Sequence, residues 1–117
     1  MNLDNIKEKL AKRVFNHLKN DEVTKQVFEN NRPSAFVDYM SCQVFGQAVL
    51  PHTDTYKNGL TVGQMNDEHH LEMLVIGLLS ADIYFREGFG KLVANKLIAH
   101  YEQEIEKPAP VKLEKVN

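Results

Sequence analysis

Apolar residues recur at helical spacing along most of the chain. In the first such segment Ile6, Leu10, Val14 and Leu18 lie four residues apart, and Phe15 widens the stripe. This period is typical of an amphipathic helix that buries one face. A polar interruption at residues 20–21 ends the segment. The pattern therefore predicts a helix at the start of the chain.

Two further helices are expected before residue 50. A short one carries Val23, Val27 and Phe28 and stops before Pro33, because a proline disfavours the helical conformation of the residue before it. The next is predicted over residues 35–49, with apolar side chains around more than half of its circumference. We therefore expect it to pack on two sides. Its apolar residues are Phe36, Tyr39, Met40, Val44, Phe45 and Ala48.

The second half of the chain predicts two longer helices after a polar loop at residues 52–60. Thr61 and Gln64 have the spacing of a capping box, which opens a helix over residues 64–79. A last helix runs from about residue 83 to 106 and contains Gly88 and Gly90, which indicate a kink or a close approach to another helix. Residues 107–117 contain two prolines and little periodicity, so we expect a disordered tail.

These elements predict one compact all-α domain of about five helices over residues 1–106. The length of 117 residues suits a single core. The formal net charge is −2 with both signs intermixed, so the sequence offers no basic face for nucleic acid. The one cysteine, Cys42, excludes a disulfide framework and a thiolate zinc site.

Nothing in the sequence indicates export or a membrane. The first residues lead into a charged amphipathic helix and not a signal peptide, and no apolar run is long enough for a membrane span. We therefore expect a cytoplasmic protein. No nucleophilic triad or phosphate-binding loop is recognisable, and the sequence leaves open whether the protein is an enzyme.

The adjacent histidines His69 and His70 are the main candidates for chemistry, because they lie in the most apolar predicted helix. A neutral imidazole commonly ligates transition metals and haem iron. His69 and Glu72 are three apart and share a helical face, but a di-iron bundle needs a second Glu-x-x-His segment, which is missing. The alternative is that both histidines are ordinary parts of a helix.

The order of features resembles that of the truncated haemoglobins, short globins in which two helices pack over two. The resemblance covers roughly residues 10–100. It rests on aromatic residues near Phe15 and Phe28 flanking a polar turn, and on Tyr56, Gly59 and Met65 before His69, with Met65 four residues before the histidine. The sequence departs from the family at Phe15, where a tyrosine is usual, and leaves little chain for a final helix.

The resemblance implies a globin-like fold, with a plain helical bundle as the alternative, and a haem held by His69. Its pocket would bind a diatomic gas such as oxygen or nitric oxide. His70 would point about 100° away from the iron. The resemblance also implies which residues line the haem pocket. Met65 and Met73 would lie near His69, and the others would be Phe15, Phe28, Phe36, Tyr39, Met40 and Gln43.

A second hypothesis fits the same residues without haem. The protein would be a non-catalytic helical regulator or adaptor that binds another protein or a second copy of itself. The broad apolar coverage of residues 35–49 would then be a partner surface or a dimer face. Under this hypothesis His69 and Phe28 are ordinary packing residues.

Overall fold

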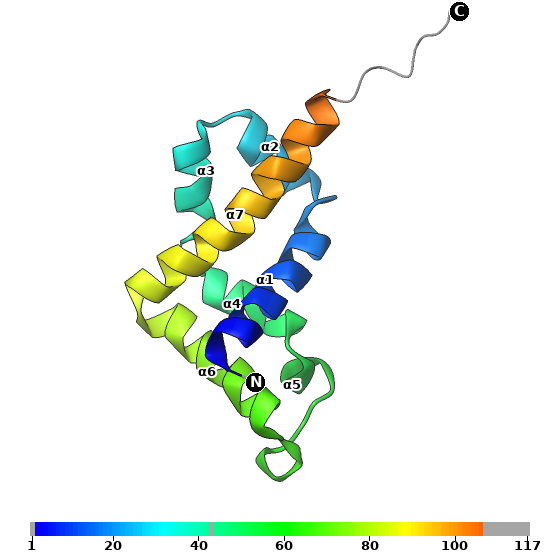
Figure 1. The fold of residues 1–117 in the computed structure, drawn as a ribbon, viewed down its shortest axis with the longest axis vertical. Coiled ribbons are helices and arrows are strands. Elements are labelled where there is room, and N and C mark those ends of the chain that lie inside the picture. The colour runs from blue at the N-terminus through cyan, green and yellow to red at the C-terminus, as the bar shows by residue number, and fades with distance from the viewer. Residues whose placement is uncertain (1, 43, 107–117) are drawn as a thin grey trace, which may run out of the picture.

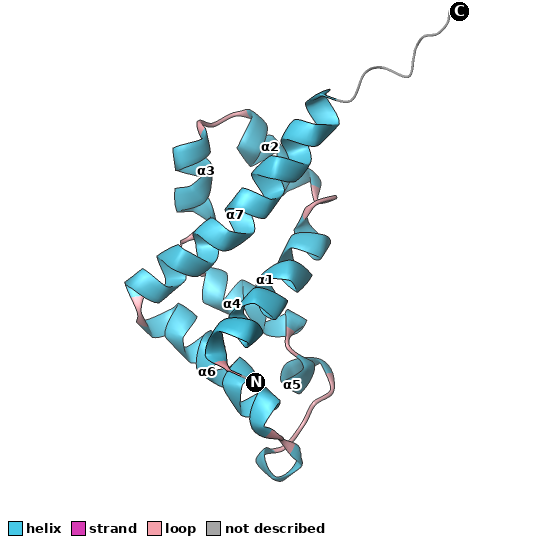
Figure 2. Ribbon diagram, in the orientation of Figure 1, coloured by secondary structure: helices cyan, strands magenta, loops and turns pink. Residues whose placement is uncertain are grey.

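All regular secondary structure in the residues that the structure describes is helical. A computed structural model describes residues 2–42 and 44–106, and Figure 2 shows helices joined by short loops with no strand among them. The prediction of an all-α fold is confirmed, with more helices than expected. The elements are α1 (Leu3–Leu18), α2 (Glu22–Glu29), α3 (Pro33–Met40), α4 (Phe45–Val49), α5 (Asp54–Lys57), α6 (Asp67–Ala81), α7 (Ile83–Glu106) and two 3₁₀ turns, η1 (Leu50–His52) and η2 (Val62–Gln64).

The helix predicted over residues 35–49 is divided into α3 and α4. At the break, the Ser41 carbonyl accepts a hydrogen bond from Arg86 Nε at 3.2 Å instead of a bond within its own helix. A side chain from α7 therefore satisfies the backbone where α3 ends. The polar loop expected at residues 52–60 also contains a short helix, α5.

The two glycines of the last helix differ in what surrounds them. The helix α7 continues through both, and a Cβ at Gly88 would meet only open space. A Cβ at Gly90 would lie 2.9 Å from the Met40 carbonyl oxygen and would overlap Ser41 Oγ. The close helix approach that the sequence predicts is therefore found at Gly90, where α7 crosses the end of α3.

The core lies where α1, α6 and the end of α3 pack against α7. Figure 1 shows α1 beside the long α7, with α6 folding back from the start of α7. The inward positions of the predicted first stripe, Ile6, Leu10 and Val14, are buried as expected. They meet an apolar set from α3, α6 and α7, which includes Phe36, Val75, Leu79, Phe89, Val93 and Leu97.

Three further expectations concern membrane insertion, the residues outside the described ranges and the globin-like arrangement. No helix among the described residues is long and apolar enough to cross a lipid bilayer. The predicted tail at residues 107–117 and the candidate residue Gln43 lie outside the described residues. The globin-like arrangement stays a prediction.

Candidate functional site

A buried carboxylate, Glu72, is the centre of the most connected polar site. It lies in the middle of α6 and is 1% exposed. Its Oε1 accepts hydrogen bonds from the backbone N–H of Thr55 at 3.1 Å and from Thr55 Oγ1 at 3.0 Å, and its Oε2 accepts from the backbone N–H of Asp54 at 3.2 Å. The first N–H groups of a helix lack partners within it. Glu72 therefore caps α5 from another helix.

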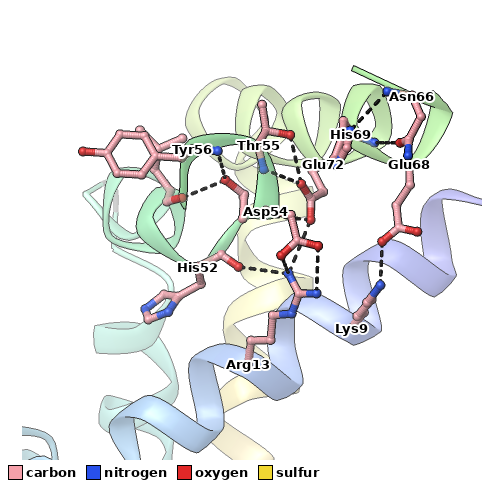
Figure 3. Close-up of polar contacts among 12 residues, drawn as sticks. Lys9, Arg13, His52, Asp54, Thr55, Tyr56, Asn66, Glu68, His69 and Glu72 are labelled. Atoms are coloured by element: carbon pink, nitrogen blue, oxygen red, sulfur yellow. Dashed lines mark hydrogen bonds and ion pairs between the residues drawn. The ribbon is translucent and has the colours of Figure 1, made fainter. Parts of the chain in front are cut away.

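Arg13 of α1 completes this site. Its guanidinium lies 3.4 Å from Glu72 Oε2 and 3.2 Å from Asp54 Oδ1, and it also donates to the His52 carbonyl oxygen at 3.2 Å. Figure 3 shows Arg13 rising from α1 toward Asp54 and Glu72. Because a buried carboxylate needs both a counter-charge and hydrogen bonds, Arg13 and α5 together explain why Glu72 is tolerated inside the protein.

A second ion pair extends the cluster along α1. Lys9, one turn before Arg13, pairs with Glu68 of α6. The carboxylate oxygens of Asp54, Glu68 and Glu72 lie within 4.8 Å of one another, a spacing at which carboxylates can share a metal ion. Here Lys9 pairs with Glu68, and Arg13 is shared between Asp54 and Glu72. The arrangement therefore ties α1, α5 and α6 together, and its chemistry is that of an ion-pair network.

A hollow of about 380 Å³ lies beside this network, with Arg13, His52 and Lys57 in its lining. The His52 ring packs on the His17 ring, with 4.8 Å between ring centroids, and Figure 3 shows it pointing away from the carboxylates. Burial lowers the pKa of His52 below its usual 6.5, and the positive charges of His17, Lys57 and Arg13 lower it further. The ring is therefore held in its neutral form more firmly than a free histidine.

The structure places His69 at the beginning of α6, where it caps the helix. Its Nδ1 accepts a hydrogen bond from the Asn66 backbone N–H at 3.1 Å, and Asn66 Oδ1 accepts from the His69 N–H at 2.9 Å. The side chain is half-buried, whereas the buried stripe of α6 begins at Glu72. His69 is therefore the more enclosed of the two histidines, and its role as a haem ligand stays a prediction. His70 is exposed, as expected.

The aromatic residues expected around a haem are not brought to His69. Phe36 and Met40 are buried in the core, and Phe28 packs on Phe36 and on Tyr101 near the end of α7. Phe15 is half-buried with its ring edge-on to His100, at 5.9 Å between centroids. These side chains fill space between α1, α2, α3 and α7.

Tyr39, which the globin resemblance implies on the far side of a haem from His69, is 44% exposed. The described residues of the expected pocket therefore do not surround one cavity.

An apolar depression does lie next to the start of α6. It has a volume of about 450 Å³, and Met65 and Met73 form one side of it. Met73 is 38% exposed and Tyr56 58% exposed, so the depression opens to the surface. The other residues of the lining come from η1, α5 and the loop that follows, and they are Leu50, Thr55, Tyr56, Gly59 and Leu60.

The sequence offered a weak signal for the polar network. A glutamate within an otherwise apolar helical stretch, and an arginine between Leu10 and Val14, both stand out as charges beside buried positions. Their pairing could not be read from the sequence, because it joins residues 59 apart. In comparisons with known proteins, no family model, curated protein or solved structure matched this chain.

Proposed function

We propose that the protein acts as a non-catalytic adaptor that binds another polypeptide in the apolar depression between α5 and α6. One observation carries the proposal: an open hollow of about 450 Å³ has two methionines, two leucines and a tyrosine in its lining. Exposed apolar groups cost free energy in water unless something covers them. The polar network, by contrast, has its charges paired internally.

The lining residues also indicate the chemistry of the partner. Methionine side chains adapt to differently shaped apolar groups, and they are frequent at surfaces that bind peptides. A partner with one bulky aliphatic or aromatic side chain, presented from a helix or an extended segment, matches such a depression. The tyrosine hydroxyl at its edge can bond to the backbone of the partner.

A peptide selection tests this proposal. A random displayed peptide library is selected on the wild-type protein, and the selected peptides are measured against Met73→Glu. We expect peptides with large apolar residues, and an affinity loss of roughly tenfold or more in Met73→Glu because the charge enters the depression. The control is Leu74→Glu, since Leu74 is the adjacent residue, is 49% exposed and lies outside the lining. Peptides that bind all three proteins equally would contradict the proposal.

A haem protein that binds a diatomic gas is the second candidate, and the same depression supports it. Met65 and Met73, which form one side of the depression, lie four residues before and after His69. Met73 and His69 therefore share a face of α6, whereas Met65 precedes that helix in extended conformation. The Nδ1 atom of His69 is used by the cap, so Nε2 is the atom with which His69 would hold the iron. The placement of Phe28, Phe36 and Met40 in the core does not add to this support.

Titration with hemin separates the two candidates. A haem protein is expected to show a Soret band that saturates at one hemin per chain and is lost or shifted in His69→Gln. Glutamine can replace His69 in the helix cap, so that this variant removes the imidazole with little effect on the fold. His70→Gln is the matched control. A titration that gives the same spectrum for all three proteins counts against haem and leaves the adaptor proposal standing.

A further inference from the structure

Tyr101, in the last part of α7, has a hydroxyl group without a partner. The residue is 3% exposed, and among the described residues its hydroxyl is the one buried side-chain oxygen or nitrogen that makes no hydrogen bond. Buried polar groups in folded proteins nearly always have a partner, because an unpaired group costs free energy. The hydroxyl therefore lacks the partner that a buried polar group normally has.

Two small hollows, each of about 150 Å³, meet at Tyr101. One lies toward α1 and is lined by Lys19 and His100 among others. The other lies between α2 and the end of α7, and we refer to it as the α2–α7 hollow. Its lining consists of Lys25, Phe28, Glu29, Tyr101, Glu104 and Ile105. At roughly 30 Å³ per water molecule, this volume holds about five waters or the end of one side chain.

The α2–α7 hollow favours a positive charge. It has two carboxylates, Glu29 and Glu104, in its lining. Helix α2 ends at Glu29 and α7 at Glu106, and neither helix has a basic residue in its last turn. Helix ends carry partial negative charge on their free carbonyl groups. Lys25 is exposed and, within the described residues, pairs with neither carboxylate.

The groups around the Tyr101 hydroxyl also favour a positive charge. Burial raises the pKa of Tyr101 above its usual 10, and the negative charges of Asp21, Glu22 and Glu29 raise it further. The hydroxyl is therefore protonated at neutral pH, and its oxygen is free to accept a hydrogen bond from a cation. An anion would meet three carboxylates instead.

Aromatic faces complete the hollow. The rings of Phe28 and Tyr101 lie 4.9 Å apart between centroids, at 39° to each other. An ammonium group is attracted to such faces, and its alkyl stem packs on them. We propose that the α2–α7 hollow is a binding subsite for an organic ammonium group, such as the end of a lysine side chain, held by Glu29, Glu104 and the Tyr101 hydroxyl.

The test uses the full chain with n-butylammonium as the probe and n-butanol as its uncharged counterpart. The Phe28 and Tyr101 ring signals are followed by NMR during each titration. We expect butylammonium to shift both rings at concentrations at which butanol does not. Glu29→Gln and Glu104→Gln should each weaken binding by roughly threefold to tenfold, because each removes one charge partner. The matched control is Glu87→Gln, which changes the same charge on an exposed part of α7 outside the hollow.

Tyr101→Phe distinguishes the subsite from an ordered water. If the hydroxyl binds the ammonium group, this variant weakens butylammonium binding several-fold and leaves the urea midpoint of the free protein unchanged or higher. Lower stability with unchanged butylammonium affinity would mean that the hydroxyl holds only water, and it would overturn the proposal. Equal responses to butylammonium and butanol, in the wild type and also in a chain without the lysines that follow α7, would overturn it as well.

A last comparison identifies the source of the ammonium group. The chain itself continues from α7 with Lys107, Lys112 and Lys115. If one of these is the occupant, the wild type responds weakly to butylammonium and the full-length triple variant K107Q/K112Q/K115Q binds it. If the occupant comes from another molecule, both chains bind the probe alike. Each of these outcomes supports the subsite, and failure of both chains to bind contradicts it.

Discussion

At the scale of single residues, Glu72 shows how a charge can be part of a protein core. A carboxylate that is 1% exposed is tolerated here because one guanidinium, one hydroxyl and two backbone N–H groups reach it. Each partner alone would leave the charge under-compensated. The site therefore behaves as a unit, in which the loss of the central group affects every member.

Replacement of Glu72 is expected to destabilise the protein strongly. Glu72→Ala leaves the N–H groups of Asp54 and Thr55 without a partner and Arg13 with one carboxylate fewer, so we expect a loss of about 3 kcal/mol in the free energy of unfolding. Glu72→Gln keeps one acceptor oxygen and should lose about half as much. Urea denaturation measures both. Glu102→Ala, on an exposed part of α7, serves as the control, and a loss for Glu72→Ala as small as in the control would contradict this account.

At the scale of elements, the helices were predictable where one face is apolar and the opposite face polar. The first helix satisfies this condition, and its buried residues include Ile6, Leu10 and Val14 of the stripe. Helix α6 does not, because exposed Met73 and Leu74 are followed directly by buried Val75 and Ile76. Its inward face is selected by the helices that pack on it, which are α1, α4, α5 and α7. The sequence of α6 alone therefore could not show which histidine faces the protein.

The start of α6 also shows that a local sequence pattern does not always predict where a helix begins. The capping box predicted at Thr61 and Gln64 is present, but it caps the start of the 3₁₀ turn η2 and not the start of the long helix. The long helix begins three residues after this turn, with Asn66 and His69 as its capping pair. Histidine is an unusual partner at this position, where glutamate or glutamine is the common choice. The imidazole therefore has a structural role in the helix cap that its residue type does not reveal.

At the scale of the whole molecule, fold class was predictable and the site was not. Helical period and composition are local properties, and they gave the all-α class correctly. The ion pairs of Arg13 and Lys9 join α1 to residues 41 to 59 positions further along, and no local pattern contains that information. The apolar depression likewise combines residues from η1, α5 and the start of α6.

Stability as a function of pH is a whole-molecule property to which His52 contributes. Its pKa is lowered in the folded protein, first by burial and then by His17, Lys57 and Arg13, so below about pH 6.5 the unfolded chain binds the proton more readily. Folding therefore loses stability as the pH falls through this value. Urea midpoints at about pH 7.5 and pH 5.5 should differ more in the wild type than in His52→Asn.

The control for this pH dependence is His70→Asn, because His70 is an exposed histidine on α6. That variant should keep the wild-type difference between the two pH values. A difference that is unchanged in His52→Asn would show that groups other than His52 carry the effect. The other charged group that faces the hollow around His52 is Asp54, which is paired with Arg13.

The pairing of Arg13 with Glu72 also orders events during synthesis of the chain. Helix α1 leaves the ribosome before α6, so Lys9 and Arg13 bear charges whose partners have not yet been made. Glu72 is translated 59 residues later than Arg13. Contacts at such separation form late, since the loop between them must close first. The network can therefore form only after α6 has been made, and the contact of α1 with α7, such as that of Glu8 with Lys96, needs a still longer chain.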